Sequence, residues 1–479
     1  MTLKKVVKDL GIIGFANMIT SLSGIILMPV LTKNLGAHGY GLWAQVGVTI
    51  SLSVMILRLG LPLSIKRLFP GKNIDEIRGD YYSILILVIT ISSIFSVLLF
   101  LFPNMLADAI FEGEVIIVRL VSLIIVVSSL DVIFLTVFRA FREMKKVGII
   151  NIITTYSFVG LAIILVLSGY DLISVIMASL AVKGTLSAAL FIMLVKKIPF
   201  KKPNFSALKE YLSLGLPAMP GGISHLVVDI SDKYIIGIFL GATFVGYYSP
   251  AYSLGMKIPV FFAGVLSVVL LPSLSDYYEK NDLSLVKQIL NLSVKYFLMI
   301  SVPTFIGVTI VGRPILTLLT TPEIAQESYM ILSLIVFAGI LIGVYTIFKQ
   351  TIFLKKRTKL ITYYWIAGAS LNFVGNLILV PGIGIMGAAI TTVASYVLVV
   401  ILVINFSCKE LPLKPDLLSI IKIVLASIFM GVSIYAISLL VWSNVFFLIV
   451  LGIILYFSTL YAIGGVGKKE IDYLMRLGK

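Results

Sequence analysis

The chain has 479 residues, of which 59% are hydrophobic and 13% are charged, and its mean hydropathy is +1.10. Soluble domains carry about 25% charged residues, so this composition excludes a soluble protein and indicates a polytopic membrane protein. The single cysteine, Cys408, excludes an internal disulfide and a cysteine-based metal site. The net charge of +16 does not predict a nucleic-acid partner, because Lys and Arg lie in short loops between apolar segments.

Fourteen apolar segments follow one another along the chain, each long enough for one membrane span. The basic N-terminal segment leads into the first of them without a small-residue cleavage site, so we expect an uncleaved span rather than a signal peptide. The predicted spans cover residues 10–31, 41–62, 81–103, 115–138, 147–168, 172–195, 210–238, 246–272, 288–311, 326–348, 360–380, 384–405, 418–440 and 443–464. This pattern predicts an all-α polytopic membrane protein with about 14 transmembrane helices.

Basic residues are concentrated in alternate loops. The N-terminal segment, every second loop and the C-terminal segment each carry several Lys or Arg residues, whereas the remaining loops carry only Lys33 and Arg313. Because Lys and Arg are retained on the cytoplasmic side, both termini are predicted to be cytoplasmic, in a plasma or inner membrane. No loop is long enough for a soluble domain, so any chemistry is expected among the helices.

The two halves of the chain resemble each other. Leu35–Thr49 (LGAHGYGLWAQVGVT) aligns with Leu240–Leu254 (LGATFVGYYSPAYSL), and both halves are predicted to begin on the inner side. Repeats of this parallel kind are typical of transporters. We therefore predict two pseudo-symmetric six-helix lobes followed by two C-terminal helices. The predicted divisions are an N-lobe at 1–195, a cytoplasmic linker at 196–209, a C-lobe at 210–405, and helices 13 and 14 with a cytoplasmic tail at 406–479.

Five basic residues lie at predicted membrane depth: Arg58, Lys183, Lys257, Arg119 and Lys295. At 1.5 Å per residue, Lys183 and Lys257 fall near the midplane, Arg58 and Lys295 in the inner half, and Arg119 near the outer surface. Charges in hydrocarbon mark functional sites, so we predict a cationic cavity. The alternative, which is strongest for Arg119 and Lys295, is that the side chains extend to lipid headgroups.

A second set of ionisable residues is predicted inside the bundle: Asp131, His225, Asp229, Asp232 and Lys233. Four of these follow helix-breaking Pro and Gly residues at 217–222, and three of the four share one helix face. One interpretation is a gate or a site for a coupling ion, either a proton or sodium. The other is local ion pairing, such as Asp229 with Lys233, or Asp131 with Arg58 or Lys183, that only offsets the cost of burial.

Two pairs of polar residues lie on one face of a predicted span. Asn17 and Ser21 are on the first span, and Asn372 and Asn376 are on the eleventh. Such side chains can hydrogen-bond sugar hydroxyls, and interhelical hydrogen bonds are an equal alternative.

Four stretches resemble segments of polysaccharide flippases. They are GLPLSIKRLF at 60–69, FRAFREMKKVGIINII at Phe138–Ile153, DKYIIGIFLGATFVGYYSPAYSL at Asp232–Leu254, and the long stretch Phe348–Val397 with its Pro-Gly turn and Gly-Ala-Ala span. Over essentially its whole length, the chain resembles the Wzx-like polysaccharide flippases of the O-antigen and teichoic-acid type. These belong to the multidrug/oligosaccharidyl-lipid/polysaccharide (MOP) exporter superfamily.

The resemblance implies two lobes in a V around a central cavity, and export of a polyprenyl-pyrophosphate-linked oligosaccharide by alternating access. It also implies that Arg58 and Lys257 line the cavity. The expected partners are this lipid-linked substrate, membrane lipids, and polysaccharide polymerase or ligase machinery. We expect a transporter rather than an enzyme, because the loops are short and carry no metal-binding carboxylate cluster. No cofactor is expected beyond a coupling ion, and ATP is not expected because no GxxxxGK[ST] motif is present. A cation-coupled multidrug exporter of the same superfamily is the alternative, although the first span carries no carboxylate.

Overall fold

The structure is a computed structural model that describes residues 3–413, 416–440 and 444–465. Within these residues the regular structure is helical and contains no strand, so the predicted all-α class is confirmed. The helices are α1 (Leu3–Leu57), α2 (Leu61–Leu68), α3 (Ile74–Leu101), α4 (Asn104–Ile110), α5 (Val115–Ala140), α6 (Met144–Leu167), α7 (Leu172–Lys197), α8 (Leu208–Gly215), α9 (Met219–Leu240), α10 (Ala242–Glu279), α11 (Leu283–Leu319), α12 (Pro322–Leu354), α13 (Lys359–Ile383), α14 (Ile385–Glu410), α15 (Leu417–Leu440) and α16 (Val445–Ala462).

The helices follow the predicted membrane spans. In the described part of the chain, twelve helices are long and apolar enough to cross a membrane. The first two predicted spans both lie in α1, which has a kink at Gly36, and α9 covers most of the seventh. The chain is therefore a multi-pass membrane protein, and the cytoplasmic placement of both termini stays a prediction.

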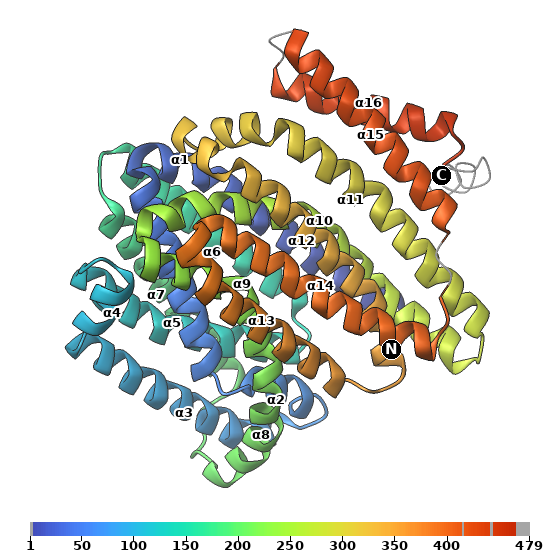
Figure 1. Cartoon of the computed structure of the whole chain (residues 1–479). Coiled ribbons are helices and arrows are strands. Elements are labelled where there is room, and N and C mark those ends of the chain that lie inside the picture. Colours follow the sequence, from blue (N-terminus) through green and yellow to red (C-terminus); the bar gives the residue numbers. More distant parts are fainter. Residues whose placement is uncertain (1–2, 414–415, 441–443, 466–479) are drawn as a thin grey trace. The chain divides into compact units, whose positions relative to one another are not determined.

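The helices form two compact units (Figure 1). Unit 1 comprises Met1–Ser249 and Asn372–Ala388, and unit 2 comprises Pro250–Leu371 and Ala389–Lys479. The boundaries cross α10, α13 and α14, so each of these helices contributes to both units. This division differs from the lobe boundaries expected from the sequence, which stay a prediction.

Helix α5 lies at the centre of unit 1, where it packs against α1, α3, α6 and α7. Its apolar side chains on more than one face are buried, among them Ile124, Phe134 and Phe138. A helix that is apolar around its circumference belongs inside a bundle. The core of unit 1 is therefore built around α5, with α3 and α7 on either side.

The repeated sequences of the two halves have the same backbone kink within unit 1. Gly36 has φ +69° and Gly241 has φ +90°, and these glycines occupy equivalent positions in Leu35–Thr49 and Leu240–Leu254. Only glycine adopts such angles without a steric penalty. The Leu-Gly pair that reveals the repeat thus sets the direction in which each following helix leaves the turn.

The same repeated segments pack against each other through two further glycines. A Cβ atom on Gly41 would lie 1.8 Å from the Ala242 carbonyl oxygen, and a Cβ atom on Gly246 would lie 1.8 Å from the Ala37 carbonyl oxygen. The contact is reciprocal, as it is across a two-fold axis. Glu112 adds to it, since its Oε1 accepts a hydrogen bond of 2.6 Å from the backbone N–H of Ala242 at the start of α10. We call these contacts the glycine junction.

The segment that links the two sequence halves is bound to α2 and α3. Asp80 is buried, and its Oδ2 lies 3.1 Å from Lys72 Nζ and accepts a 2.9 Å hydrogen bond from the Tyr211 hydroxyl. Ser64 donates to the Tyr211 carbonyl at 2.6 Å. Helices α2 and α8 accordingly lie side by side (Figure 1), close enough that a Cβ on Gly60 would collide with the backbone of α8.

Unit 2 is organised around α11, which packs against α12, α15 and α16. The Phe297 ring of α11 fills the space that a side chain at Gly343 of α12 would need. Trp365 donates a 2.8 Å hydrogen bond to the Tyr345 hydroxyl, which joins α13 to α12. The last two helices, α15 and α16, pair with each other (Figure 1).

Replacing a glycine of the junction should destabilise the protein. We expect Gly246→Ala to lower the thermal unfolding midpoint, because the new Cβ meets a backbone carbonyl that side-chain movement cannot clear; such overpacking costs about 1–3 kcal/mol. Gly47→Ala is the matched control, since a Cβ there has nothing within 4 Å. Unfolding of the purified protein in detergent measures both variants. Equal midpoints for the two variants would contradict the tight junction.

Candidate functional site

The most completely buried carboxylate of the predicted set lies in a polar network inside unit 1. Asp232 on α9 has no exposed surface. Its Oδ2 accepts a 2.5 Å hydrogen bond from the Tyr248 hydroxyl on α10, and its Oδ1 accepts a 2.6 Å hydrogen bond from Asn376 Nδ2 on α13. Asn376 also donates to Asn372 Oδ1 at 3.2 Å, and Ser231 donates to the same oxygen at 2.6 Å. We call these five residues the Asp232 network.

The Asp232 network contains residues from three helices, whereas the sequence pattern relates only residues on the same helix. The sequence predicts Asp232 as a coupling or gating residue, and it predicts that Asn372 and Asn376 contact either sugars or neighbouring helices. Both amides are fully buried and bonded within the network. This arrangement is typical of an interhelical hydrogen-bond network, and their contact with sugar stays a prediction.

The remaining ionisable residues of α9 lie close to this network. His225 Nδ1 is 3.1 Å from Asp229 Oδ2, so the structure pairs Asp229 with the histidine one turn earlier. Lys233 is close enough to both Asp229 and Asp232 for their charges to act on it. The predicted face of α9 therefore carries charges of both signs.

The oxygen atoms of the Asp232 network suit a singly charged ion better than a divalent one. The network offers one carboxylate together with neutral amide and hydroxyl groups, and divalent sites use more negative ligands. Across residues 3–413, 416–440 and 444–465, no group of three or more His, Cys, Asp or Glu residues could hold a metal ion.

Three basic side chains gather in unit 1 near the predicted inner surface. The Arg58 guanidinium contacts the Met55 sulfur and forms no ion pair among the described residues. Lys66 lies on α2, outside the spanning helices, and its pKa is lowered by burial and by the positive charges of Arg139 and Arg58. Of these three residues, the sequence identifies only Arg58 as a cavity residue. Lys66 and Arg139 lie at predicted inner loops, where Lys and Arg are expected from the orientation of the spans alone.

The other predicted cavity residues are in different surroundings. Lys257, on the part of α10 in unit 2, has a buried Nζ with no hydrogen-bond partner in the described structure. Arg119 is exposed, with its guanidinium 5.4 Å from the centre of the Phe100 ring. Lys295 acts on Asp416, whose pKa is lowered by hydrogen bonds from Ser419 and by this positive charge. Lys257 is thus the cation of this set that has the strongest need for a ligand.

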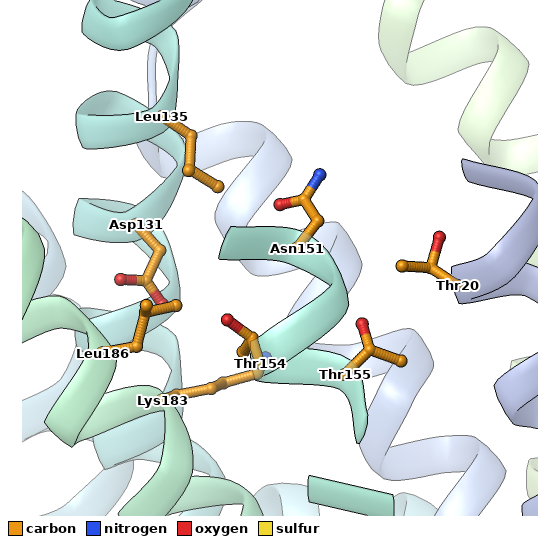
Figure 2. A pocket seen from close by; sticks show the side chains of 8 residues that line it. All are labelled: Thr20, Asp131, Leu135, Asn151, Thr154, Thr155, Lys183 and Leu186. Atoms are coloured by element: carbon orange, nitrogen blue, oxygen red, sulfur yellow. The ribbon is translucent and has the colours of Figure 1, made fainter. Parts of the chain in front are cut away.

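The last candidates lie in the N-terminal helices of unit 1. Asn17 and Ser21 are exposed on α1, where Ser21 donates to the Asn17 carbonyl at 2.8 Å. Asp131 and Lys183 line one pocket between helices (Figure 2). They do not form an ion pair within the described residues, since Lys183 donates to Ser128 Oγ at 2.9 Å and Asp131 Oδ1 is buried without a partner.

Comparison with known families connects this architecture to transport. Residues 6–278 match the family described as "Polysaccharide biosynthesis protein", and residues 217–378 match the MatE family. Among curated relatives, the probable low-salt glycan biosynthesis flippase Agl15 of Haloferax volcanii is 24% identical over 277 residues, which is 57% of each chain. An uncharacterised membrane protein of Methanocaldococcus jannaschii is 28% identical over 271 residues, covering 55% of this chain and 52% of that protein. The chain thus spans about half the length of these curated relatives.

Solved structures share the fold over most of the chain. The lipid II flippase MurJ in an inward closed conformation has a TM-score of 0.80 at 17% identity, covering 93% of this chain and 97% of that one. An inward-facing multidrug resistance MATE family transporter of the MOP superfamily has a TM-score of 0.65 at 13% identity, covering 83% and 94%. At 17% and 13% sequence identity, these similarities show a shared fold and nothing about the substrate.

Removing a donor to the buried carboxylate should destabilise the Asp232 network. Tyr248→Phe leaves Asp232 Oδ2 without its 2.5 Å hydrogen bond, and an unsatisfied buried charge costs about 1–3 kcal/mol or more. Tyr435→Phe on the exposed face of α15 is the control. We expect the first variant to lower the thermal unfolding midpoint and the second to leave it unchanged. A Tyr248→Phe protein as stable as the control would show that the hydroxyl is dispensable.

Proposed function

Because the chain belongs to the polysaccharide biosynthesis protein family, matched over residues 6–278, we propose that it flips a polyprenyl-pyrophosphate-linked oligosaccharide. The lipid-linked glycan would move from the inner to the outer leaflet of the cell membrane by alternating access. A relative and a structural neighbour, Agl15 and MurJ, are both described as flippases, which supports this proposal at the level of transport class.

The buried ammonium of Lys257 is the observation that carries the proposal. A charge inside a helix bundle is retained where it has a function, and this one has no hydrogen-bond partner among the described residues. The diphosphate of a lipid-linked glycan would supply the missing anion. Lysine suits this role because its compact charge can follow a phosphate group as it moves.

Unit 1 also contains groups that suit an anionic substrate, namely the basic cluster of Arg58, Lys66 and Arg139. Like charges held close together repel each other, and this repulsion adds to burial in lowering the pKa of Lys66. An arriving diphosphate would relieve this repulsion, and arginine can bind it through two parallel hydrogen bonds. We propose that these three residues receive the diphosphate at the inner side, in the orientation that the charge distribution predicts.

The Asp232 network is proposed as the place where a coupling ion acts. Sodium or a proton would add positive charge at the buried carboxylate, on which the charge of Lys233 also acts. Asp232, Asn372, Asn376 and Tyr248 would hold this charge by their oxygen atoms, and α9, α10 and α13 would be fixed together as a result. Release of the ion would then loosen contacts among the three helices.

The glycine junction is proposed as one closed contact of the transport cycle. It lies in the predicted outer loops and consists of close backbone packing together with the hydrogen bond from Ala242 to Glu112. Separation of the two segments would expose this charged group to water on the outer side. Polysaccharide polymerase or ligase machinery would then consume the flipped glycan outside.

A cation-coupled multidrug exporter is the second candidate. The MatE match to residues 217–378 and the shared fold of MATE transporters favour it. However, cationic drugs are repelled by unpaired basic residues, and Lys257 together with Arg58, Lys66 and Arg139 suits an anion. The glycan flippase is therefore the better-supported function.

Loss of the unpaired cations should abolish glycan export. We expect Lys257→Ala and Arg58→Ala each to reduce surface polysaccharide about tenfold or more, because a charge-assisted bond to phosphate is worth about 1.5–3 kcal/mol. Lipid-linked precursor should accumulate in the inner leaflet. The measurement is complementation of a strain that lacks the protein, with membrane levels checked by immunoblot.

Lys280→Ala is the matched control for this experiment, since Lys280 is exposed and paired with Asp276 at 2.9 Å. It should export normally, and Lys257→Arg should retain part of the activity. Normal polysaccharide in both alanine variants would overturn the anionic-substrate proposal. A gain in drug sensitivity with normal polysaccharide would favour the multidrug exporter.

Sodium should stabilise the protein through Asp232 if it is the coupling ion. We expect NaCl, compared with choline chloride at equal ionic strength, to raise the thermal unfolding midpoint of the wild type and to leave that of Asp232→Asn unchanged. Asp276→Asn, at an exposed carboxylate, is the control and should respond as the wild type does. An unchanged wild-type midpoint would exclude sodium and leave the proton as the coupling ion.

A further inference from the structure

A polar pocket of about 280 Å³ lies within unit 1, among four helices of the N-terminal half. Figure 2 shows Asp131 on α5 and Lys183 on α7 beside the helix α6, which carries Asn151, Thr154 and Thr155. Thr20 of α1 faces them from the opposite side. Its lining residues differ from those of the Asp232 network, and the uncharged ones were not identified from the sequence.

The pocket has a buried base and an accessible rim. Asp131 is 9% exposed, and its Oδ1 is buried without a hydrogen-bond partner in the described residues. Thr20, Asn151 and Thr155 on the rim are half-buried. A buried carboxylate oxygen without a donor is costly, so a molecule in the pocket that donated a hydrogen bond to Asp131 would lower this cost.

The charges of the pocket restrict what that molecule can be. Asp131 contributes one negative charge and Lys183 one positive charge, and the remaining polar lining is neutral. The two opposite charges offset each other, so neither a cation nor an anion gains a net attraction from the pocket. The same lining provides acceptors at Asp131, donors at Lys183, and both kinds of group at Asn151 and the threonines. This combination suits a neutral molecule with several hydroxyl groups.

A purely structural ion pair would give a different arrangement. Two charges that only neutralised each other would be in contact, since contact is what offsets their desolvation. Here Lys183 Nζ instead donates to Ser128 Oγ at 2.9 Å, and Ser187 lies beside the Asp131 carboxylate. The two charged groups are thus held by neighbouring hydroxyls and remain on the wall of an open space.

We infer that this pocket binds a single uncharged sugar residue of the transported glycan. The inference rests on the proposed flippase function and adds a recognition site for the neutral part of the substrate. The volume is near the lower end of the range for ligand sites, about 300–1,000 Å³, so it accommodates one ring rather than an oligosaccharide. Leu135 and Leu186 supply an apolar surface for the carbon face of the ring.

The position of the pocket suits loading from the inner leaflet. Asp131 precedes Ala140, the last residue of α5, by nine positions, or about 14 Å along the helix axis. In the predicted orientation this end of α5 is cytoplasmic. A sugar attached to a diphosphate near Arg58 and Arg139 would therefore lie deeper in the bundle than its diphosphate, on the same side of the membrane.

Protection of an introduced cysteine from alkylation tests the inference directly. The background is Cys408→Ser, because Cys408 is the chain's single cysteine. Thr155→Cys places a thiol on the pocket wall, and Thr185→Cys, exposed on α7 and outside the pocket, is the control. The purified full chain is treated with N-ethylmaleimide. The probes are the oligosaccharide released by mild acid from the host's lipid-linked glycans, its constituent monosaccharides, sodium pyrophosphate, and NaCl against KCl.

We expect the released oligosaccharide, or one of its monosaccharides, to slow alkylation of T155C about fivefold or more at saturation and to leave T185C unaffected. Adding Asp131→Asn to T155C should raise the sugar concentration needed for protection about tenfold, because the bond to a charged acceptor is lost. Protection by NaCl alone would show a cation site, and protection by pyrophosphate alone would show an anion site. Either result, or no protection by any sugar, would overturn the inference.

The inference and the proposed function can fail separately. If Lys257→Ala abolishes export but no sugar protects T155C, the flippase function stands and the sugar pocket is wrong. If sugars protect T155C while Lys257→Ala and Arg58→Ala both export normally, the pocket binds sugar and the cation-dependent flippase proposal is wrong.

Discussion

The cost of placing an ionisable side chain among apolar helices is the constraint on which the rest of this structure depends. Three buried ionisable groups differ in how far their neighbours offset this cost. Asp232 has both carboxylate oxygens bonded and no exposed surface. Asp131 has one oxygen without a donor beside an open pocket, and Lys257 has an ammonium without a partner. In the first arrangement, hydrogen bonds within the described residues satisfy the carboxylate, and the proposed coupling ion would add to them. In the other two, a polar atom has no partner among the described residues, and the proposed substrate would supply one.

The internal repeat supplies the geometry around these groups. Gly36 and Gly241 kink the chain at equivalent positions, and the helices that follow meet through Gly41 and Gly246. Because each glycine receives the backbone of the opposite segment, the contact is reciprocal, and close approach depends on the absence of a side chain. Glu112 is the charged side chain of the junction, where it accepts a hydrogen bond from the backbone N–H of Ala242. The buried carboxylates Asp131 and Asp232 lie elsewhere in unit 1, so the junction can rearrange while their hydrogen bonds stay in place.

Much of the fold could be predicted because hydropathy reports burial in a bilayer directly. Fourteen apolar segments correspond to described helices, and the two cases that differ, α1 and α9, involve a glycine kink and a break after α8. The functional site was harder to predict from the sequence. Asp232 was identifiable as an ionisable residue in an apolar segment, but its partner Asn376 lies 144 residues away, and periodicity groups only residues on one helix. Thr20, Asn151 and Thr155 carried no signal, since threonine and asparagine in spanning helices usually bond within or between helices.

A division of the substrate into a charged part and a neutral part follows from these positions. Cations such as Arg58 and Lys257 attract any diphosphate, so they contribute affinity without distinguishing one glycan from another. The pocket at Asp131 and Lys183 has both signs of charge and a neutral lining, so it contributes little attraction at a distance. Its discrimination comes from hydrogen bonds: a sugar that lacks the matching hydroxyl leaves Asp131 Oδ1 unbonded, and sites of this design reject such analogues strongly. Under the proposed function, the choice of glycan would depend on the uncharged residues of α1 and α6, while the basic residues would select a lipid diphosphate.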